Sequence, residues 1–360
     1  MNLMKAAAVA FSTLAAPLAL ATQAGAYCAG VNLIDQMLPG DLAVLRALTD
    51  AEPYSRGNFW TAEKDGLKMT VVGTYHLDDA RHNAVTDLLA EDVHEARALL
   101  VEAGPAEEEA LMKAMGADPS LMFITTGPSL LERLPRDTWR RLSEALEARG
   151  IPGVFAAKFQ PWYATMVLAI PPCMMAQTDI KNGLDAQLIA AAEAADVPVR
   201  ALEPYDTLFS IFGALTEEQS IGMIESSLAL EGQSEDFAVT MADLYFQGDS
   251  RMIWELSRFY AYDQPGYSRE EVDAELAVME DVMMVRRNHA WIPVIEAAAA
   301  EGPVVVAFGA LHLSGQDGVL QLLADRGWRL TPRYLAPEQP EEQPEEQPEP
   351  TGNWMASPAP

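Results

Sequence analysis

The chain has 360 residues, of which 49% are hydrophobic and 21% are charged, so wholesale disorder is excluded and a substantial core is expected. Its 24 basic and 53 acidic residues give a formal net charge of −29 at pH 7. Such a charge repels phosphate backbones and anionic lipid surfaces, which argues against nucleic-acid binding.

The N-terminal segment has the parts of a secretory signal peptide. Lys5 precedes an uncharged run over 6–21, and Ala24-Gly25-Ala26 supplies small residues for cleavage before Tyr27. A retained membrane anchor is the alternative, but the run is shorter than the roughly 20 residues of a spanning helix. We therefore expect residues 1–26 to be removed on export, and no later segment is apolar enough to be a transmembrane segment.

The chain contains two cysteines, Cys28 and Cys173. Export places both in an oxidising compartment, where they can pair as a disulfide, and two unpaired thiols are the alternative. Their distance in the sequence excludes a CxxC redox pair, and a thiolate zinc site needs more cysteines.

The first β pattern is a hairpin. Apolar segments at 59–61 and 67–72 flank Asp65-Gly66, a common turn pair. The second segment runs into Gly73-Thr74-Tyr75-His76. His76 therefore follows directly after a strand.

A helix over 84–96 comes next, and a strand over 99–101 then ends at Glu102. This strand, helix and strand predict a parallel pair. We expect the strand before Glu102 to lie beside the strand before His76. His82 and His94, in or beside the helix, are expected at the surface.

The middle of the chain is mostly helical, and the β pattern returns near the end. A short strand over 197–202 reaches Glu203, and a strand over 304–308 leads into Gly309-Ala310-Leu311-His312. This alternation predicts an α/β fold. The other expected elements are helices over 137–149, 164–170, 184–195, 216–300 (interrupted by a turn at 264–266) and 315–326, and a last strand over 328–331.

The last residues, 337–360, repeat Pro-Glu-Gln and carry many carboxylates. A segment of this composition cannot pack a core. We therefore expect a disordered acidic tail after a domain that spans 27–336.

The strongest chemical signal is a pair of Gly-x-x-His motifs, ending at His76 and His312, each directly after a strand. Ligands of open α/β sheets gather at the carboxyl ends of strands, and Glu102 and Glu203 follow strands as well. Two imidazoles with one or two carboxylates suit a divalent transition metal such as zinc, manganese or cobalt, or metal-free general acid–base catalysis. Arg287 is a further candidate, with a surface salt bridge as its alternative role.

Taken together, these segments resemble the TraB/GumN family (the TraB/PrgY/GumN group), to which the Tiki proteases are related. The resemblance covers about residues 50–333 and is most specific over 308–320. In chain order, the matching segments are 72–76, 99–102, 158–162, 183–185, 199–203, 287–288, 308–320 and 327–328.

The resemblance implies a fold like that of the Tiki, erythromycin-esterase and ChaN-like proteins. In such a fold two pseudo-repeated α/β halves, each with a strand–GxxH–helix unit, close over a shared cleft, with a helical region in the middle of the chain. It also implies a set of site residues, namely the motif histidines His76 and His312, the acidic residues Glu102 and Glu203, and the pair Arg287 and Asn288.

We therefore expect a periplasmic or secreted hydrolase, with a metal-dependent peptidase acting on a peptide or protein as the favoured activity. His76, Glu102 and His312 would hold a divalent metal ion (Mn, Co or Zn) or activate water. Arg287 and Asn288 would stabilise the oxyanion.

Glu203 is expected to help bind the substrate. One alternative is a metal-free, esterase-like hydrolase that uses the same residues. Another is a non-catalytic binding protein for a peptide, haem or a polysaccharide component. The sequence does not give the oligomeric state.

Mass spectrometry of the protein from the periplasm tests the expected export. The mature chain should begin at Tyr27, because Ala24-Gly25-Ala26 is the only small-residue segment directly after the apolar run. A mature protein that retains Met1 would contradict this prediction.

Overall fold

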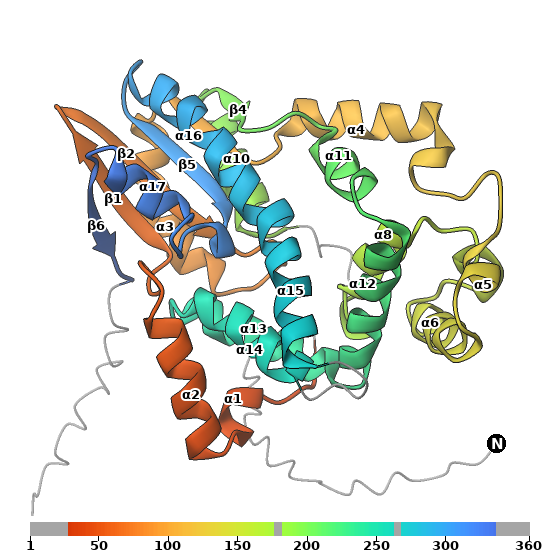
Figure 1. Ribbon diagram of the computed structural model, residues 1–360. Helices are drawn as coiled ribbons and strands as arrows, with labels where there is room; N and C mark the ends of the chain where they lie inside the picture. The colour runs from red at the N-terminus through yellow and green to blue at the C-terminus, as the bar shows by residue number, and fades with distance from the viewer. Residues whose placement is uncertain (1–27, 176–181, 263–267, 336–360) are drawn as a thin grey trace, which may run out of the picture.

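The computed structural model describes residues 28–175, 182–262 and 268–335 (Figure 1). The expected signal peptide over 1–26, the turn at 264–266 and the tail over 337–360 lie outside the described residues. Within them the chain forms one six-stranded mixed sheet with many helices, which confirms a mixed α/β fold. An internal pseudo-repeat stays a prediction.

The sheet has the order β4-β3-β5-β2-β1-β6. Its first four strands in this order are parallel to one another, and β1 is antiparallel to both of its neighbours. The strands are β1 (Phe59–Lys64), β2 (Leu67–Thr74), β3 (Ala98–Val101), β4 (Val199–Ala201), β5 (Val304–Gly309) and β6 (Arg329–Arg333).

Helices cover the sheet and build the rest of the molecule. Before and between the first strands lie α1 (Leu33–Gln36), α2 (Pro39–Asp50) and α3 (His82–Glu95). The middle contains α4 (Pro105–Ala117), α5 (Leu130–Arg133), α6 (Arg136–Ala148), α7 (Gly153–Ala156), α8 (Pro161–Leu168), α9 (Pro172–Met175), α10 (Leu184–Ala194), α11 (Thr207–Gly213), α12 (Glu217–Leu230), α13 (Ser234–Phe246), α14 (Ser250–Tyr262) and α15 (Arg269–Glu280). A π-helical turn, η3 (Asp281–Val285), joins α15 to α16 (Arg286–Ala299), and α17 (Val319–Asp325) precedes β6. Short 3-10 turns are η1 (Pro119–Leu121), η2 (Glu231–Gln233) and η4 (Ala310–His312).

The main core lies on the sheet. Helices α3 and α10 pack against each other, as do α16 and α17, and all four bury apolar side chains with the strands. Every residue of β5 is buried, so both faces of the sheet are covered there. Figure 1 shows α15 and α16 as a nearly continuous column between the sheet and the helices α4, α8, α11 and α12.

The expected hairpin is confirmed. β1 and β2 pair antiparallel from Lys64 opposite Leu67 outward. The two turn residues, Asp65 and Gly66, have φ values of 50° and 84°. A two-residue turn with both φ values positive matches the twist of the strands, and aspartate followed by glycine is suited to it.

The sequence predicts that β3 lies beside β2, and this prediction is wrong. β5 lies between β3 and β2, with Val101 opposite Ala307 and Thr74 opposite Gly309. The most apolar strand thus takes the central position, where both faces are buried, and α3 crosses over it to reach β3. The carboxyl ends of β4, β3, β5 and β2 nevertheless meet at one edge of the sheet.

Two further expectations need correction. The helix expected from residue 315 begins at Val319, because Gly315 has a φ of 99° and belongs to a turn. His82 is fully buried, because it shares a stripe of α3 with Val85 and Leu89 and packs against the ring of Phe246. His94 is exposed, as expected.

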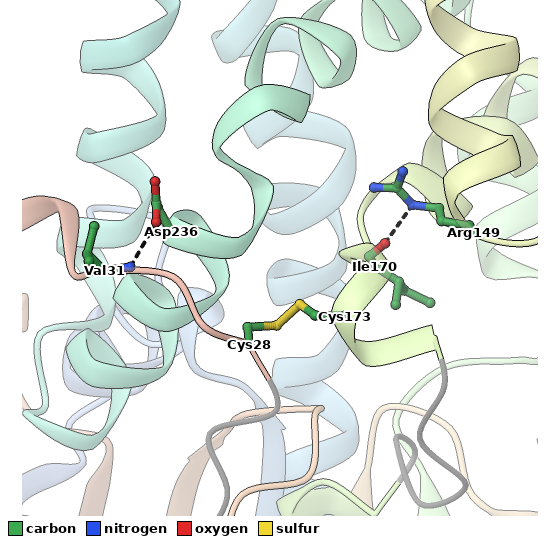
Figure 2. Close-up of a disulfide and its surroundings, with 6 residues drawn as sticks. All are labelled: Cys28, Val31, Arg149, Ile170, Cys173 and Asp236. Atoms are coloured by element: carbon green, nitrogen blue, oxygen red, sulfur yellow. Dashed lines mark hydrogen bonds between the residues drawn. A yellow bond between two sulfur atoms is a disulfide. The ribbon is translucent and has the colours of Figure 1, made fainter.

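A disulfide joins Cys28 to Cys173 and so ties the N-terminal segment to α9 (Figure 2). Near it the Val31 N–H donates to the carboxylate of Asp236 over 2.8 Å. The disulfide is consistent with export. Over residues 28–175, 182–262 and 268–335, no helix is long and apolar enough to cross a membrane.

Replacing both cysteines by alanine should lower the free energy of unfolding by up to about 5 kcal/mol, because the bond closes a loop between residues 145 positions apart. Denaturant unfolding measures the change. Reductant should lower the midpoint of the wild type and leave the double variant unaffected. An unchanged midpoint in fully reduced wild-type protein would contradict the prediction.

Candidate functional site

The carboxyl edge of the sheet brings together side chains from distant parts of the sequence. Glu203 follows β4, Glu102 follows β3, His312 lies in the turn after β5, and His76 follows β2. Together with Arg287 of α16 they line a cavity of about 630 Å³. The edge is therefore the candidate site.

His76 is held by Asp185, in the first turn of α10. Its Nδ1–H donates to Asp185 Oδ2 over 2.7 Å, and the Thr74 hydroxyl donates to Asp185 Oδ1 over 2.6 Å. The His76 side chain is 61% exposed. The ring is thus fixed through Nδ1, and its Nε2 has no hydrogen-bond partner among the described residues, which leaves it for a substrate or water.

Two glycines permit this arrangement by close approach. A Cβ atom on Gly183, just before α10, would lie 2.3 Å from the carbonyl carbon of His76. A Cβ atom on Gly309 would lie 3.0 Å from His76 Nε2 and 3.3 Å from Glu102 Oε1. The second motif glycine therefore leaves the space in which an imidazole and a carboxylate lie side by side.

Arg287 lies at the centre of the site and is buried. Its Nε donates to Glu203 Oε2 over 2.9 Å, and its Nη2 donates to Glu203 Oε1 over 2.7 Å and to Glu102 Oε2 over 2.6 Å. Its Nη1 donates to His312 Nε2 over 3.2 Å and to the Met283 carbonyl over 3.1 Å. A guanidinium has five N–H donors, so all of them are used within the protein.

The backbone before Arg287 is the π-helical turn η3, and it supplies the Met283 carbonyl. Such turns inside α-helices are frequent at functional sites. One turn after Arg287, the Trp291 indole N–H donates to Glu203 Oε2 over 3.0 Å, and its ring centroid lies 4.5 Å from that of His312. One helical face thus contacts both Glu203 and His312.

His312 is buried and neutral. Its Nδ1–H donates to Asn288 Oδ1 over 2.6 Å, and the Asn288 amide donates to the Asp317 carbonyl over 2.9 Å. This leaves the Nε2 lone pair to accept from Arg287. Burial lowers the pKa of His312 to about 3; the charge of Glu102 opposes this shift, and the charges of Arg287 and His76 add to it.

Glu102 and His76 are both charged at neutral pH. Burial alone would raise the pKa of Glu102, but the cationic form that His312 takes at low pH, the charges of Arg287 and His76, and the Gly309 N–H lower it to about 2. Loss of water would lower the pKa of His76, but the charge and hydrogen bond of Asp185, with the charge of Glu102, raise it to about 9. At neutral pH the site therefore holds a charged His76, an ionised Glu102 and a neutral His312.

The donor types of this edge fit a transition metal, but their arrangement does not. His312 Nε2 lies 4.0 Å from Glu102 Oε1, yet it accepts from Arg287, as does Glu102 Oε2. A metal ion would need these lone pairs and would lie next to a guanidinium. Within the described part of the chain, no group of three or more His, Cys, Asp or Glu side chains is placed to hold a metal ion.

Sequence reasoning did not single out two residues of this site. Asp185 belongs to a segment that resembles the family, but its expected place in the first turn of a helix gives no reason to pair it with His76. Trp291 could have been identified from the sequence, because it lies four residues after Arg287 and the two side chains therefore share one helical face.

The comparison with known proteins adds a family match. The model of the TraB/PrgY/gumN family matches residues 58–332. "Uncharacterized protein YbaP" of Escherichia coli (strain K12) is 23% identical over 277 residues, which are 74% of this chain and 94% of that protein. The protein of the same description from Shigella flexneri is 23% identical over 256 residues, 70% of this chain and 86% of that protein.

Arg287→Met should lower the free energy of unfolding by about 3–5 kcal/mol, because it leaves the carboxylates of Glu102 and Glu203, only 20% and 11% exposed, without their cation. Adding Glu203→Gln should recover part of the loss, since one unpaired charge is then removed. The matched control is Arg286→Met. It removes an exposed ion pair with Asp281 and should lower the free energy of unfolding by less than about 1 kcal/mol. Equal losses for the two arginine variants in chemical denaturation would contradict the central role of Arg287.

Proposed function

The chain belongs to the TraB/PrgY/gumN family, and we propose that it is an exported hydrolase that cleaves an ester or amide bond with its own side chains. The observation that supports this proposal is the His76–Asp185 pair. It combines a fixed Nδ1 with an exposed ring whose Nε2 has no partner in the described part of the chain, at the cavity that Glu102 also lines. An imidazole oriented by a carboxylate is a common general base.

In the proposed step, Nε2 of neutral His76 takes a proton from a water molecule, and the water oxygen bonds to the carbonyl carbon of the substrate. Asp185 keeps the proton on Nδ1 and stabilises the imidazolium that forms. When the tetrahedral intermediate collapses, the bond to the leaving oxygen or nitrogen breaks and the imidazolium protonates that atom. The products are a carboxylic acid and an alcohol or amine, and His76 is neutral again.

The other residues act through position in this proposal. Arg287 uses all five N–H donors on protein acceptors, so we assign it the task of holding Glu102, Glu203 and His312 rather than a direct contact with the oxyanion. Asn288 fixes the tautomer of His312 and is not among the residues that line the cavity. Both assignments differ from the roles that the sequence predicts.

A metal-dependent peptidase using Mn, Co or Zn is the second candidate, and one observation favours it. Both His76 and His312 donate from Nδ1 to a side-chain acceptor, as metal-ligating histidines usually do. This activity requires Arg287 to release His312 and Glu102. A non-catalytic binder of a peptide, haem or polysaccharide component is the remaining alternative.

The pH dependence of ester and peptide hydrolysis tests the proposal. The rate should rise with pH through the His76 pKa of about 9, because only the neutral ring accepts a proton. His76→Ala should lower the rate by about 10²-fold or more. Asp185→Asn should move the rise to lower pH, because it removes the charge that raises the pKa, and should also lower the maximal rate.

His94→Ala, on an exposed face of α3, is the matched control and should leave the rate unchanged. A wild-type rate in His76→Ala would contradict the proposal. Activity that a chelator removes and Mn, Co or Zn restores would favour the second candidate. Ligand binding without hydrolysis of any ester or peptide would favour the binding protein.

A further inference from the structure

The cavity above the candidate site has a polar floor and an apolar wall. The wall includes partly exposed apolar side chains from six separate elements, α4, α8, α11, α14, α15 and η3. Within the described residues they belong to none of the four apolar clusters that hold the fold together. These side chains are Leu111, Met166, Leu208, Trp254, Met279 and Met283.

Side chains of this kind do not stabilise a core, so their apolar surface is available to a ligand. Methionine is prominent among them, and its flexible, polarizable side chain adapts to apolar groups of different shape. The wall is continuous with the floor, because Met283 belongs both to the wall and to the backbone contact of Arg287. His76 and these methionines therefore line one continuous cavity.

The wall offers few partners to a peptide backbone. Extended peptides commonly bind by pairing with the edge strand of a sheet. Here the edge strands are β4 and β6, whereas His76 and His312 follow the inner strands β2 and β5. The wall is helical, and helices use their backbone groups internally.

The charges of the cavity select against anions. Four carboxylates line it, those of Glu102, Glu107, Glu108 and Glu203. Two cations face them, Arg287, whose donors are all used, and His76, which is charged at neutral pH, so the carboxylates outnumber the cations by four to two. This excess of negative charge disfavours a free fatty acid or a phosphate ester relative to a neutral ester.

We propose that the substrate is a neutral acyl ester whose long alkyl chain lies along the methionine wall while its carbonyl group meets His76. The volume of about 630 Å³ falls within the range of cavities that bind small organic ligands. This inference rests on the proposed hydrolase function and names its substrate class.

A chain-length series tests it, using the mature protein and the butanoyl, octanoyl and dodecanoyl esters of one alcohol. The ratio kcat/KM should rise about tenfold for every two methylenes added. Each methylene that leaves water for the apolar wall adds the same increment of favourable free energy, and equal increments multiply kcat/KM by a constant factor. A kcat/KM that stays constant or falls with chain length, or faster turnover of peptides than of esters, would overturn this inference but not the proposed hydrolase function.

Substitutions in the apolar wall test whether the wall causes the rise of kcat/KM with chain length. Met166→Gln combined with Met279→Gln should remove most of the rise with chain length, because amides replace the apolar contacts. The conservative pair Met166→Leu and Met279→Leu should keep it, which separates loss of apolarity from loss of folding. The matched control is Met112→Gln, on an exposed face of α4 outside the cavity, and it should behave as wild type. A glutamine pair with an unchanged rise would overturn the proposal.

Binding without turnover separates this inference from the proposed function. In titrations of His76→Ala protein, neutral dodecanol should bind at least about tenfold more tightly than the dodecanoate anion, and the glutamine pair should weaken dodecanol binding. If dodecanol behaves so but no ester is hydrolysed by the wild type, the hydrolase function fails and the alkyl-chain site stands. If dodecanol does not bind, or dodecanoate binds equally well, the inference is wrong.

Discussion

A buried guanidinium must have all its charge and donors compensated, and this constraint on Arg287 organises the site. Its partners, Glu203, Glu102 and His312, follow three neighbouring strands, while Arg287 itself comes from a helix. One side chain therefore connects the column formed by α15 and α16 to the carboxyl edge of the sheet. The π-helical turn before it places a backbone carbonyl where the fifth donor needs one.

The same constraint gives two similar sequence motifs opposite properties. His312 lies inside the Arg287 network and has a pKa of about 3, whereas His76 lies outside it beside Asp185 and has a pKa of about 9. Two titratable groups with pKa values driven apart by their surroundings are typical of divided catalytic tasks. On this account His76 exchanges protons, and His312 is a fixed part of the polar floor that supports Glu102 and Arg287.

Much of this edge could be predicted from local pattern. The hairpin turn, the two glycine motifs after strands and Glu102 are all encoded within a few residues, and parallel strands bring their ends together. The central place of β5 could not be predicted, because the order of parallel strands depends on long-range packing. The partner of His76, Asp185, and the contacts of Arg287 depend on how helices far away in sequence dock, which no local spacing encodes. The burial of His82 could have been predicted from its helical spacing to Val85 and Leu89, but histidine is a polar residue type, which favoured a surface position.

The most direct test of this division is a nitrogen-15 NMR titration of the His76 and His312 side chains in the intact protein. The account predicts that His312 keeps its proton on Nδ1 and stays neutral from mildly acidic to alkaline pH, while His76 loses a proton near its raised pKa of about 9. A His312 that takes up a proton near the ordinary histidine pKa of 6.5 would contradict the account. So would a simultaneous shift of both Nε2 resonances on addition of Zn²⁺.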